Sequence, residues 1–328
     1  MQSSVSITLN NEVENLTLTG AVGLAGTGNA LNNIIIGTVG NDTLNGDIGN
    51  DTIFGGTGAD SLTGGAGNDQ LFGGNDLDSV FGGAGDDVLQ IVTAAELVAG
   101  ETYDGGADND FLYGGGLGVA LDLSTSTVTG IENLASFSTG VTLTSAQLDG
   151  FSGYIGFVPT ITLTTGGAID LCDLDFDGIT TLNLSAAGNT LQILSGTLGG
   201  YVGPLDGSFQ GIVNGGAGND SVVVSGAYSI GSITLNGFGG NDTLTGGIGN
   251  ETIAGGSGSD SLTSGVGFSS DTFVFAFADG GTTDTITDFQ FGFGGDAFQV
   301  TNAINGSIRY IGSNSFEVGS GGISCNTP

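Results

Sequence analysis

The sequence predicts an all-β protein built as a parallel β-solenoid, and three observations support this fold class. A nine-residue unit repeats from Gly37 without a break in its frame. Glycine accounts for 67 of the 328 residues and recurs at fixed positions of the unit, whereas only three prolines occur. Each unit ends in three residues with one apolar side chain between two others, the pattern of a short strand with one inward position. Self-similarity at such a short period is typical of solenoids.

The nine-residue units fall into two arrays that share an acidic sixth position. The first array runs as GTVGNDTLN, GDIGNDTIF, GGTGADSLT, GGAGNDQLF, GGNDLDSVF and GGAGDDVLQ, with a further unit, GGADNDFLY, at 105–113. Its acidic positions are Asp42, Asp51, Asp60, Asp69, Asp78, Asp87 and Asp110. In the second array, Asp220, Asp242, Glu251 and Asp260 hold this position, and Asp271 follows two residues late.

The unit predicts a metal site. Glycines at its first, second and fourth positions allow tight turns with positive backbone dihedrals. Two units make one coil, and stacked coils lie about 4.8 Å apart. Carboxylates and carbonyls of successive turns then converge into an all-oxygen cage that suits Ca²⁺. Without metal, like charges would stack at that spacing, which is costly. Roughly ten bound Ca²⁺ ions would offset much of the formal charge of −33.

These units resemble the nonapeptide GGxGxDxUx of the repeats-in-toxin (RTX) family. The resemblance covers roughly residues 1–116 and 213–300 and implies a right-handed parallel β-roll with a row of Ca²⁺ along each edge. It implies ligand roles for the acids at the sixth position. Asn33 and Glu251 are weaker matches, because the first is neutral and the second is one methylene longer than Asp.

The repeats divide the chain into four expected segments. Residues 1–116 are a lead-in and the first β-roll, 117–212 a metal-poor middle, 213–275 the second β-roll, and 276–328 an aromatic-rich cap. The middle alternates with period two and shows no amphipathic helix. It therefore favours a continued metal-free β-helix, with an inserted β-sandwich as the alternative.

One motif of the middle segment stands apart. Asp173, Asp175 and Asp177 precede Gly178 and spell D-x-D-x-D-G, the opening of an EF-hand-like calcium loop. The twelfth position holds Leu184 rather than Glu, so the EF-hand itself is not expected. The motif is interpreted either as a calcium site or as one strand face that carries three acids.

Composition excludes several functions. Arg309 is the single Lys or Arg, so the counterion release that drives binding to nucleic acid is missing. Without His or Lys, histidine-based triads, histidine-ligated zinc and Schiff bases are excluded, and no enzyme is expected. No apolar run is long enough for membrane insertion. Cys172 and Cys325 are either bridged or two separate thiols.

Export is expected even though the first 30 residues lack a secretory signal pattern. The family resemblance implies that a C-terminal stretch carries the signal for type I secretion, which places the protein outside the cell or on its surface. The aromatic residues from Asp271 onward are expected to plug the end of the solenoid. They are Phe273, Phe275, Phe277, Phe289, Phe291, Phe293 and Phe298.

The expected function is that of an extracellular structural protein, a filament or surface-layer subunit that folds and self-assembles on Ca²⁺. Strand-like sequence at the N-terminus favours head-to-tail contacts between copies. The outward ninth positions Ile36, Phe54 and Phe72 favour a lateral contact. The alternative is a non-catalytic accessory or adhesin module that binds cell-surface glycan beside an exported enzyme. Ice binding is disfavoured because the outward third positions form no regular Thr array.

Overall fold

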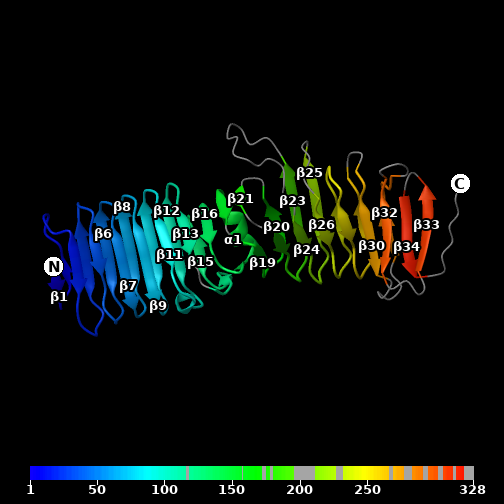
Figure 1. The fold of residues 1–328 in the computed structure, drawn as a ribbon. Helices are drawn as coiled ribbons and strands as arrows, with labels where there is room; N and C mark the ends of the chain where they lie inside the picture. Colours follow the sequence, from blue (N-terminus) through cyan, green and yellow to red (C-terminus); the bar gives the residue numbers. More distant parts are fainter. Residues whose placement is uncertain are drawn as a thin grey trace. The chain divides into compact units, whose positions relative to one another are not determined.

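The structure is a computed structural model, and it describes most of the chain as short parallel strands (Figure 1). The described residues are 1–115, 118–156, 158–171, 175–177, 180–195, 211–226, 232–265, 269–276, 283–290, 295–301, 306–312 and 315–320. The chain forms two compact units. Unit 1 consists of Met1–Leu143, Gly150–Pro159 and Leu174–Gly178, and unit 2 of Thr144–Asp149, Thr160–Asp173 and Ile179–Pro328. The predicted all-β solenoid class is confirmed.

Unit 1 contains two long parallel sheets whose strands alternate along the chain. Sheet A has the order β1 (Gln2–Ser3), β3 (Asn15–Leu18), β5 (Ile34–Ile36), β7 (Thr52–Thr57), β9 (Gln70–Asn75), β11 (Val88–Ile91), β13 (Phe111–Gly114), β16 (Asn133–Ser136), β18 (Tyr154–Gly156) and β21 (Asp175–Asp177). Sheet B has the order β15 (Thr127–Thr129), β12 (Thr102–Ala107), β10 (Ser79–Ala84), β8 (Ser61–Ala66), β6 (Thr43–Ile48), β4 (Ala25–Asn29) and β2 (Ile7–Thr8). A further parallel pair joins β14 (Leu121–Asp122) to β17 (Val141–Leu143).

Unit 2 repeats this plan with its own two sheets. Sheet C includes, in order, β19 (Thr160–Leu163), β22 (Thr181–Asn183), β24 (Ile212–Asn214), β26 (Thr234–Asn236), β28 (Thr252–Ala254), β30 (Thr272–Ala276) and β32 (Ala297–Thr301). Sheet D has the order β20 (Gly167–Asp170), β23 (Asn189–Ser195), β25 (Ser221–Gly226), β27 (Thr243–Thr245), β29 (Ser261–Thr263), β31 (Thr283–Ile286), β34 (Ser315–Ser320) and β33 (Gly306–Gly312). Strands β31, β34 and β33 pair antiparallel, unlike the coils before them.

The core follows from the eighth position of the unit. Thr43 pairs with Ser61, so equivalent residues 18 apart lie side by side in β6 and β8. Because neighbouring side chains of a strand point to opposite faces, the apolar eighth positions all turn inward. They stack as Leu44, Leu62 and Val80 from sheet B and Ile53, Leu71 and Leu89 from sheet A, each at most 1% exposed.

The first array keeps its register across one insertion. Residues 92–100, here called the corner loop, contain the 3₁₀ helix η1 (Ala94–Glu96). Ser79 therefore pairs with Thr102, 23 residues later, instead of 18. The additional residues stay at the corner of the coil, and β12 continues sheet B in the same parallel register.

Two predictions for the middle segment are tested by the fold. Its described strands pair in parallel, as expected for a continued β-helix rather than an inserted antiparallel sandwich. The expectation of no helix is wrong, because α1 (Ser145–Gly150) forms there. Thr144 and Gln147 make a capping box, in which each side chain accepts the backbone N–H of the other, at 2.8 and 3.1 Å. The pattern T-x-x-Q was the overlooked signal.

Aromatic residues near the C-terminus pack inside unit 2, and that they plug the end of the solenoid stays a prediction. Phe273, Phe275 and Phe289 are at most 5% exposed. The rings of Phe289 and Phe298 stack with centroids 4.3 Å apart. Phe277, Phe291 and Phe293 lie outside the described residues, as do Cys172 and Cys325.

Candidate metal centre

The acids at the sixth position form two hydrogen-bonded columns in unit 1. The backbone N–H of Asp42 donates to Oδ1 of Asp60 at 2.7 Å, and Asp60 bonds to Asp78 in the same way at 2.8 Å. The other column joins Asp51, Asp69, Asp87 and Asp110 through bonds of 2.7 Å. The structure thus brings the first-array acids together, one per coil on each edge.

The second carboxylate oxygen of most of these residues has no protein partner. Among the described residues, buried Oδ2 atoms without a hydrogen bond belong to Asp51, Asp60, Asp69, Asp78, Asp87, Asp110 and Asp242. These side chains are at most 3% exposed, so they are shielded from bulk water. A buried carboxylate oxygen without a hydrogen-bond donor or a cation lowers the free energy of unfolding, and this cost recurs in each coil.

Glycine at the first position shapes the space around that oxygen. A Cβ on Gly55 would overlap both Oδ2 of Asp60 and the carbonyl oxygen of Gly73 in the next coil. The same overlap would occur at Gly64, with Asp69 and Gly82. A carboxylate oxygen and a backbone carbonyl therefore converge on a corner that only glycine leaves open.

An opposing ladder lies on the outside of the same turns. The backbone N–H of Asn50 donates to Oδ1 of Asn32 at 2.9 Å, and that of Asn68 donates to Asn50 at 3.0 Å. The fifth-position side chain thus accepts from the following coil, whereas the sixth-position Asp accepts from the preceding coil. This arrangement explains why Asn and Asp recur together at the fifth and sixth positions of the unit. The ladder bond uses only one carboxylate oxygen of each Asp.

Burial raises the pKa of these carboxyl groups. It raises the pKa of Asp60 and Asp87 to about 7, and the backbone N–H bonds offset this only in part. Asp51 and Asp69 rise to about 6 for the same reason, and neighbouring acids add to the shift. A cation beside Oδ2 would favour the ionised form and reverse the shift.

The N-terminal end of the columns differs from the rest. Both carboxylate oxygens of Asp42 accept backbone N–H bonds, from Leu24 at 2.6 Å and from Thr38. Asn33 accepts the N–H of Asn29 at 2.8 Å and donates its own N–H to Asp51. The side-chain oxygens of Asp42 and Asn33 are therefore satisfied by hydrogen bonds alone. These two positions have fewer free oxygen atoms for a cation than the acids of the coils that follow.

Unit 2 contains a ladder of the same kind. The N–H of Asp220 donates to Asp242 at 2.8 Å, and that of Asp242 donates to Asp260 at 2.9 Å. Asp220 also accepts the N–H of Gly216 at 2.9 Å through Oδ2, which leaves it better bonded than Asp242. The N–H of Glu251 donates to Asp271 at 2.7 Å, so the displaced Asp271 still reaches its place in the second column.

Several acids of the ladder were not predicted from the sequence. Asp110 donates its N–H to Glu132, and Asp260 and Asp271 donate theirs to Asp284 and Asp296, at 2.8 to 3.1 Å. Their coils are 22 to 25 residues long, which a fixed nine-residue frame does not detect. The signal available was an Asp or Glu directly before a three-residue alternating segment.

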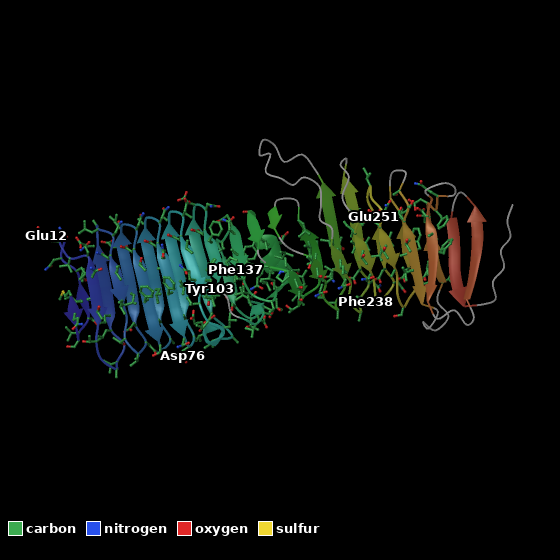
Figure 2. The ribbon with its side chains drawn as sticks, in the orientation of Figure 1. Glu12, Asp76, Tyr103, Phe137, Phe238 and Glu251 are labelled. Carbon is green, nitrogen blue, oxygen red and sulfur yellow. The ribbon has the colours of Figure 1, made fainter. Side chains whose placement is uncertain are left out.

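Glu101 was also missed, and it interrupts the ladder. It precedes β12 as Asp78 precedes β10, and it is 1% exposed. Its carboxylate accepts the hydroxyl of Tyr103 at 2.7 Å, and Tyr103 takes the inward place that an aliphatic residue holds elsewhere (Figure 2). Burial raises the pKa of Glu101 to about 7.

The D-x-D-x-D-G motif is only partly described. Asp175 and Asp177 lie on β21, which pairs in parallel with β18, so this stretch is strand rather than an EF-hand loop. Asp173 lies outside the described residues.

The donor set fits a hard cation. In the part of the chain that the structure describes, no three Asp, Glu, Cys or His side chains cluster as a metal site. A cation in these corners would therefore take one or two carboxylate oxygens and complete its shell with carbonyls of the glycine turns. Ca²⁺ accepts such flexible all-oxygen coordination, whereas Zn²⁺ prefers nitrogen and sulfur.

Comparison with known proteins agrees with this chemistry. A family model, the RTX calcium-binding nonapeptide repeat, matches residues 27–62, 54–89, 99–116 and 234–268. A search of curated proteins found no match to the chain. Among the described residues, no helix has the length and apolar character needed to span a membrane. The matched segments coincide with the glycine corners of both units, and the chain is therefore an RTX β-roll protein.

Proposed function

We propose that this chain is an extracellular structural protein that folds and assembles when its glycine corners bind Ca²⁺. An acidic chain exported from a calcium-poor cytoplasm would fold outside the cell in about millimolar calcium, where sites of modest affinity suffice. We propose no catalytic role, since RTX β-rolls are typically non-catalytic and the buried sixth-position acids sit in ladder corners. Roughly ten ions is the expected load.

The observation that supports this proposal is the repeated buried Oδ2 without a hydrogen-bond partner. It recurs in successive coils at Asp51, Asp69 and Asp87, together with a carbonyl of the next coil. Hydrogen bonding alone accounts for Oδ1 but leaves Oδ2 uncompensated. Divalent cations shared along each edge would compensate it in every coil and link neighbouring coils.

Self-assembly is supported by the contrast between the two outer faces of unit 1. At the ninth positions of sheet A, Ile36 is 40% exposed and the rings of Phe54 and Phe72 stack with centroids 4.6 Å apart. The equivalent positions of sheet B hold Asn45, Thr63 and Phe81. An apolar row on one face favours a lateral contact with a second copy, and edge strands β1 and β2 could add a head-to-tail contact.

Sedimentation in calcium and then in chelator tests the proposal. We expect large polymers that dissociate on chelation, and we expect Phe72→Thr to weaken assembly while Phe81→Thr, on sheet B, does not. A calcium-loaded monomer that binds cell-surface glycan would instead support the accessory or adhesin function. A chain that binds no Ca²⁺ would refute the proposal altogether.

A further inference from the structure

Three corners keep the shape of the regular glycine corners but close it with a hydrogen bond. They belong to Asn33 and Asp42 in unit 1 and to Asp220 in unit 2, and they are called the hydrogen-bonded corners here. In each, a Cβ on the first-position glycine would overlap the sixth-position side chain and a carbonyl oxygen of the next coil, as for Gly37 with Asp42 and Gly55. Their glycine and carbonyl therefore match those of the regular corners.

The difference is a backbone N–H from the second position of the unit. In each hydrogen-bonded corner, this N–H donates to the side-chain oxygen that faces the glycine. The donor and acceptor pairs are Asn29 and Asn33, Thr38 and Asp42, and Gly216 and Asp220. In the next coils, the equivalent Oδ2 atoms of Asp51, Asp60 and Asp242 accept no hydrogen bond. A donor thus takes the place where a cation would otherwise bind.

The backbone of the second position differs between the two kinds of corner. Gly56, Gly65 and Gly83 hold this position in regular corners, with φ values of 114°, 122° and 121°. The three donors of the hydrogen-bonded corners lie outside this left-handed region. A change in the sign of φ rotates the peptide group, so that its N–H turns toward the side-chain oxygen or away from it. Two of the donors, Asn29 and Thr38, carry a Cβ, which disfavours a positive φ.

Further donors complete these corners. The side-chain amide of Asn33 donates to the carbonyls of Val13 and Glu14 at 3.2 and 3.3 Å. Oδ1 of Asp220 accepts both the backbone N–H and the side-chain amide of Asn189, at 2.7 and 2.8 Å. None of the three sixth-position side chains has a buried oxygen without a hydrogen bond. A cation would therefore have to displace a donor that is already in place.

Each hydrogen-bonded corner also positions the acid of the next coil. Its sixth-position residue donates a backbone N–H to Oδ1 of that acid, whose Oδ2 has no partner. The three bonds run from Asn33 to Asp51 at 2.6 Å, from Asp42 to Asp60 at 2.7 Å and from Asp220 to Asp242 at 2.8 Å. The carboxylates beside these corners are therefore held by a bond that requires no cation.

We propose that the hydrogen-bonded corners form without calcium, exclude it, and serve as the template on which the neighbouring calcium corners order. This inference rests on the proposed calcium function and states which corners that function leaves out. It assigns Asn33, Asp42 and Asp220 to folding rather than to calcium ligation. Each unit carries such a template of its own, so neither ladder needs calcium for its first bond.

Elemental analysis of calcium bound to the full chain tests the exclusion. Asp42→Asn should keep the number of bound ions, because both oxygens of Asp42 are already used by hydrogen bonds. The matched control is Asp60→Asn, the next acid of the same column, which should lower the number of bound ions. An equal loss of calcium in the two variants would overturn the inference.

Hydrogen exchange of the unsubstituted chain in chelator tests the template and needs no variant to fold. The N–H groups of Thr38 and Gly216 should exchange about tenfold more slowly than those of Asp69 and Asp87, which donate to acids of regular corners. Equal or faster exchange at Thr38 and Gly216 would overturn the inference and leave the proposed function standing. Absence of calcium binding by the unsubstituted chain would overturn both.

Discussion

The acid-laddered corners of 37–113 and the neutral turn of 136–140, between β16 and β17, solve the same packing problem in different ways. Both join short parallel strands around stacked aliphatic residues, such as Leu62 beside the first and Leu121 beside the second. The neutral turn is closed through hydroxyls: Ser136 donates to Ser138 at 2.9 Å, and Ser138 donates to the carbonyl of Gly140 at 2.7 Å.

This difference shows that a parallel coil does not need buried acids. A turn can be closed with neutral groups whose polar atoms bond to one another. The Asp columns add desolvation and like-charge repulsion that the neutral turn avoids. Their recurrence therefore indicates a ligand that offsets both costs.

Removing calcium should have the largest effect. At a free calcium concentration 100 times the dissociation constant, each bound ion stabilises the folded state by about 2.7 kcal/mol. With several sites in the first array, chelation should destabilise β6 to β10 and lower their protection more than that of β14 and β17. Hydrogen exchange with and without chelator measures this, and equal loss of protection in both regions would contradict the contrast.

A methyl group at a first-position glycine should have the next largest effect. Gly64→Ala would overlap both Asp69 and the Gly82 carbonyl, so we expect a loss of about 3 kcal/mol of unfolding free energy in calcium. Gly150→Ala is the matched control, because no heavy atom lies within 4 Å of a Cβ at that position. Denaturant unfolding measures the loss of unfolding free energy in both variants. Similar losses would show that a Cβ in the glycine corner costs no more than one at Gly150.

The calcium-free protein should lose stability as pH rises, which is the opposite of the usual behaviour of salt-bridged acids. Burial raises the pKa of Asp51 to about 6 and that of Asp60 to about 7, from 3.8. The folded state therefore holds protons that the unfolded state releases, so stability is greatest below about pH 4 and declines up to about pH 7. Melting in chelator at pH 5 and pH 8 checks the sign.

Calcium should reverse this dependence, because protons compete with the cation for the same carboxylates. Melting temperatures measured in calcium should rise between pH 5 and pH 8. A calcium-loaded protein that followed the same downward trend as the chelated one would contradict carboxylate ligation.

The smallest expected effect concerns the backbone of the corners. Phe238 replaces the second glycine of its unit, keeps a φ of 69°, and is 58% exposed (Figure 2). Phe238→Gly should stabilise the protein by about 1 kcal/mol, because left-handed backbone is costly for a residue with a Cβ. Phe238→Ala should give no such gain, since alanine keeps the Cβ, and calorimetric melting of both variants measures the difference.

The regular repeat was enough to predict the solenoid, its inward eighth positions and the stacking of the sixth-position acids. These features depend on local periodicity, and Leu44, Leu62 and Asp60 lie where the frame puts them. The four-segment division of the chain and the calcium roles of individual acids remain predictions. Glu101, Glu132 and Asp284 were missed because coils of irregular length hide their equivalence, which only the register of the strands reveals.

The corner loop at 92–100 shows how tolerant this architecture is of added sequence. Five additional residues enter the coil there, yet the bond from Asp87 to Asp110 keeps the 2.7 Å length seen in uninterrupted coils. The additional residues lie in the corner loop, and the strands on either side of it keep their parallel register. Such a corner could carry a grafted epitope or peptide tag, and a series of such grafts would display them at intervals set by the coil spacing.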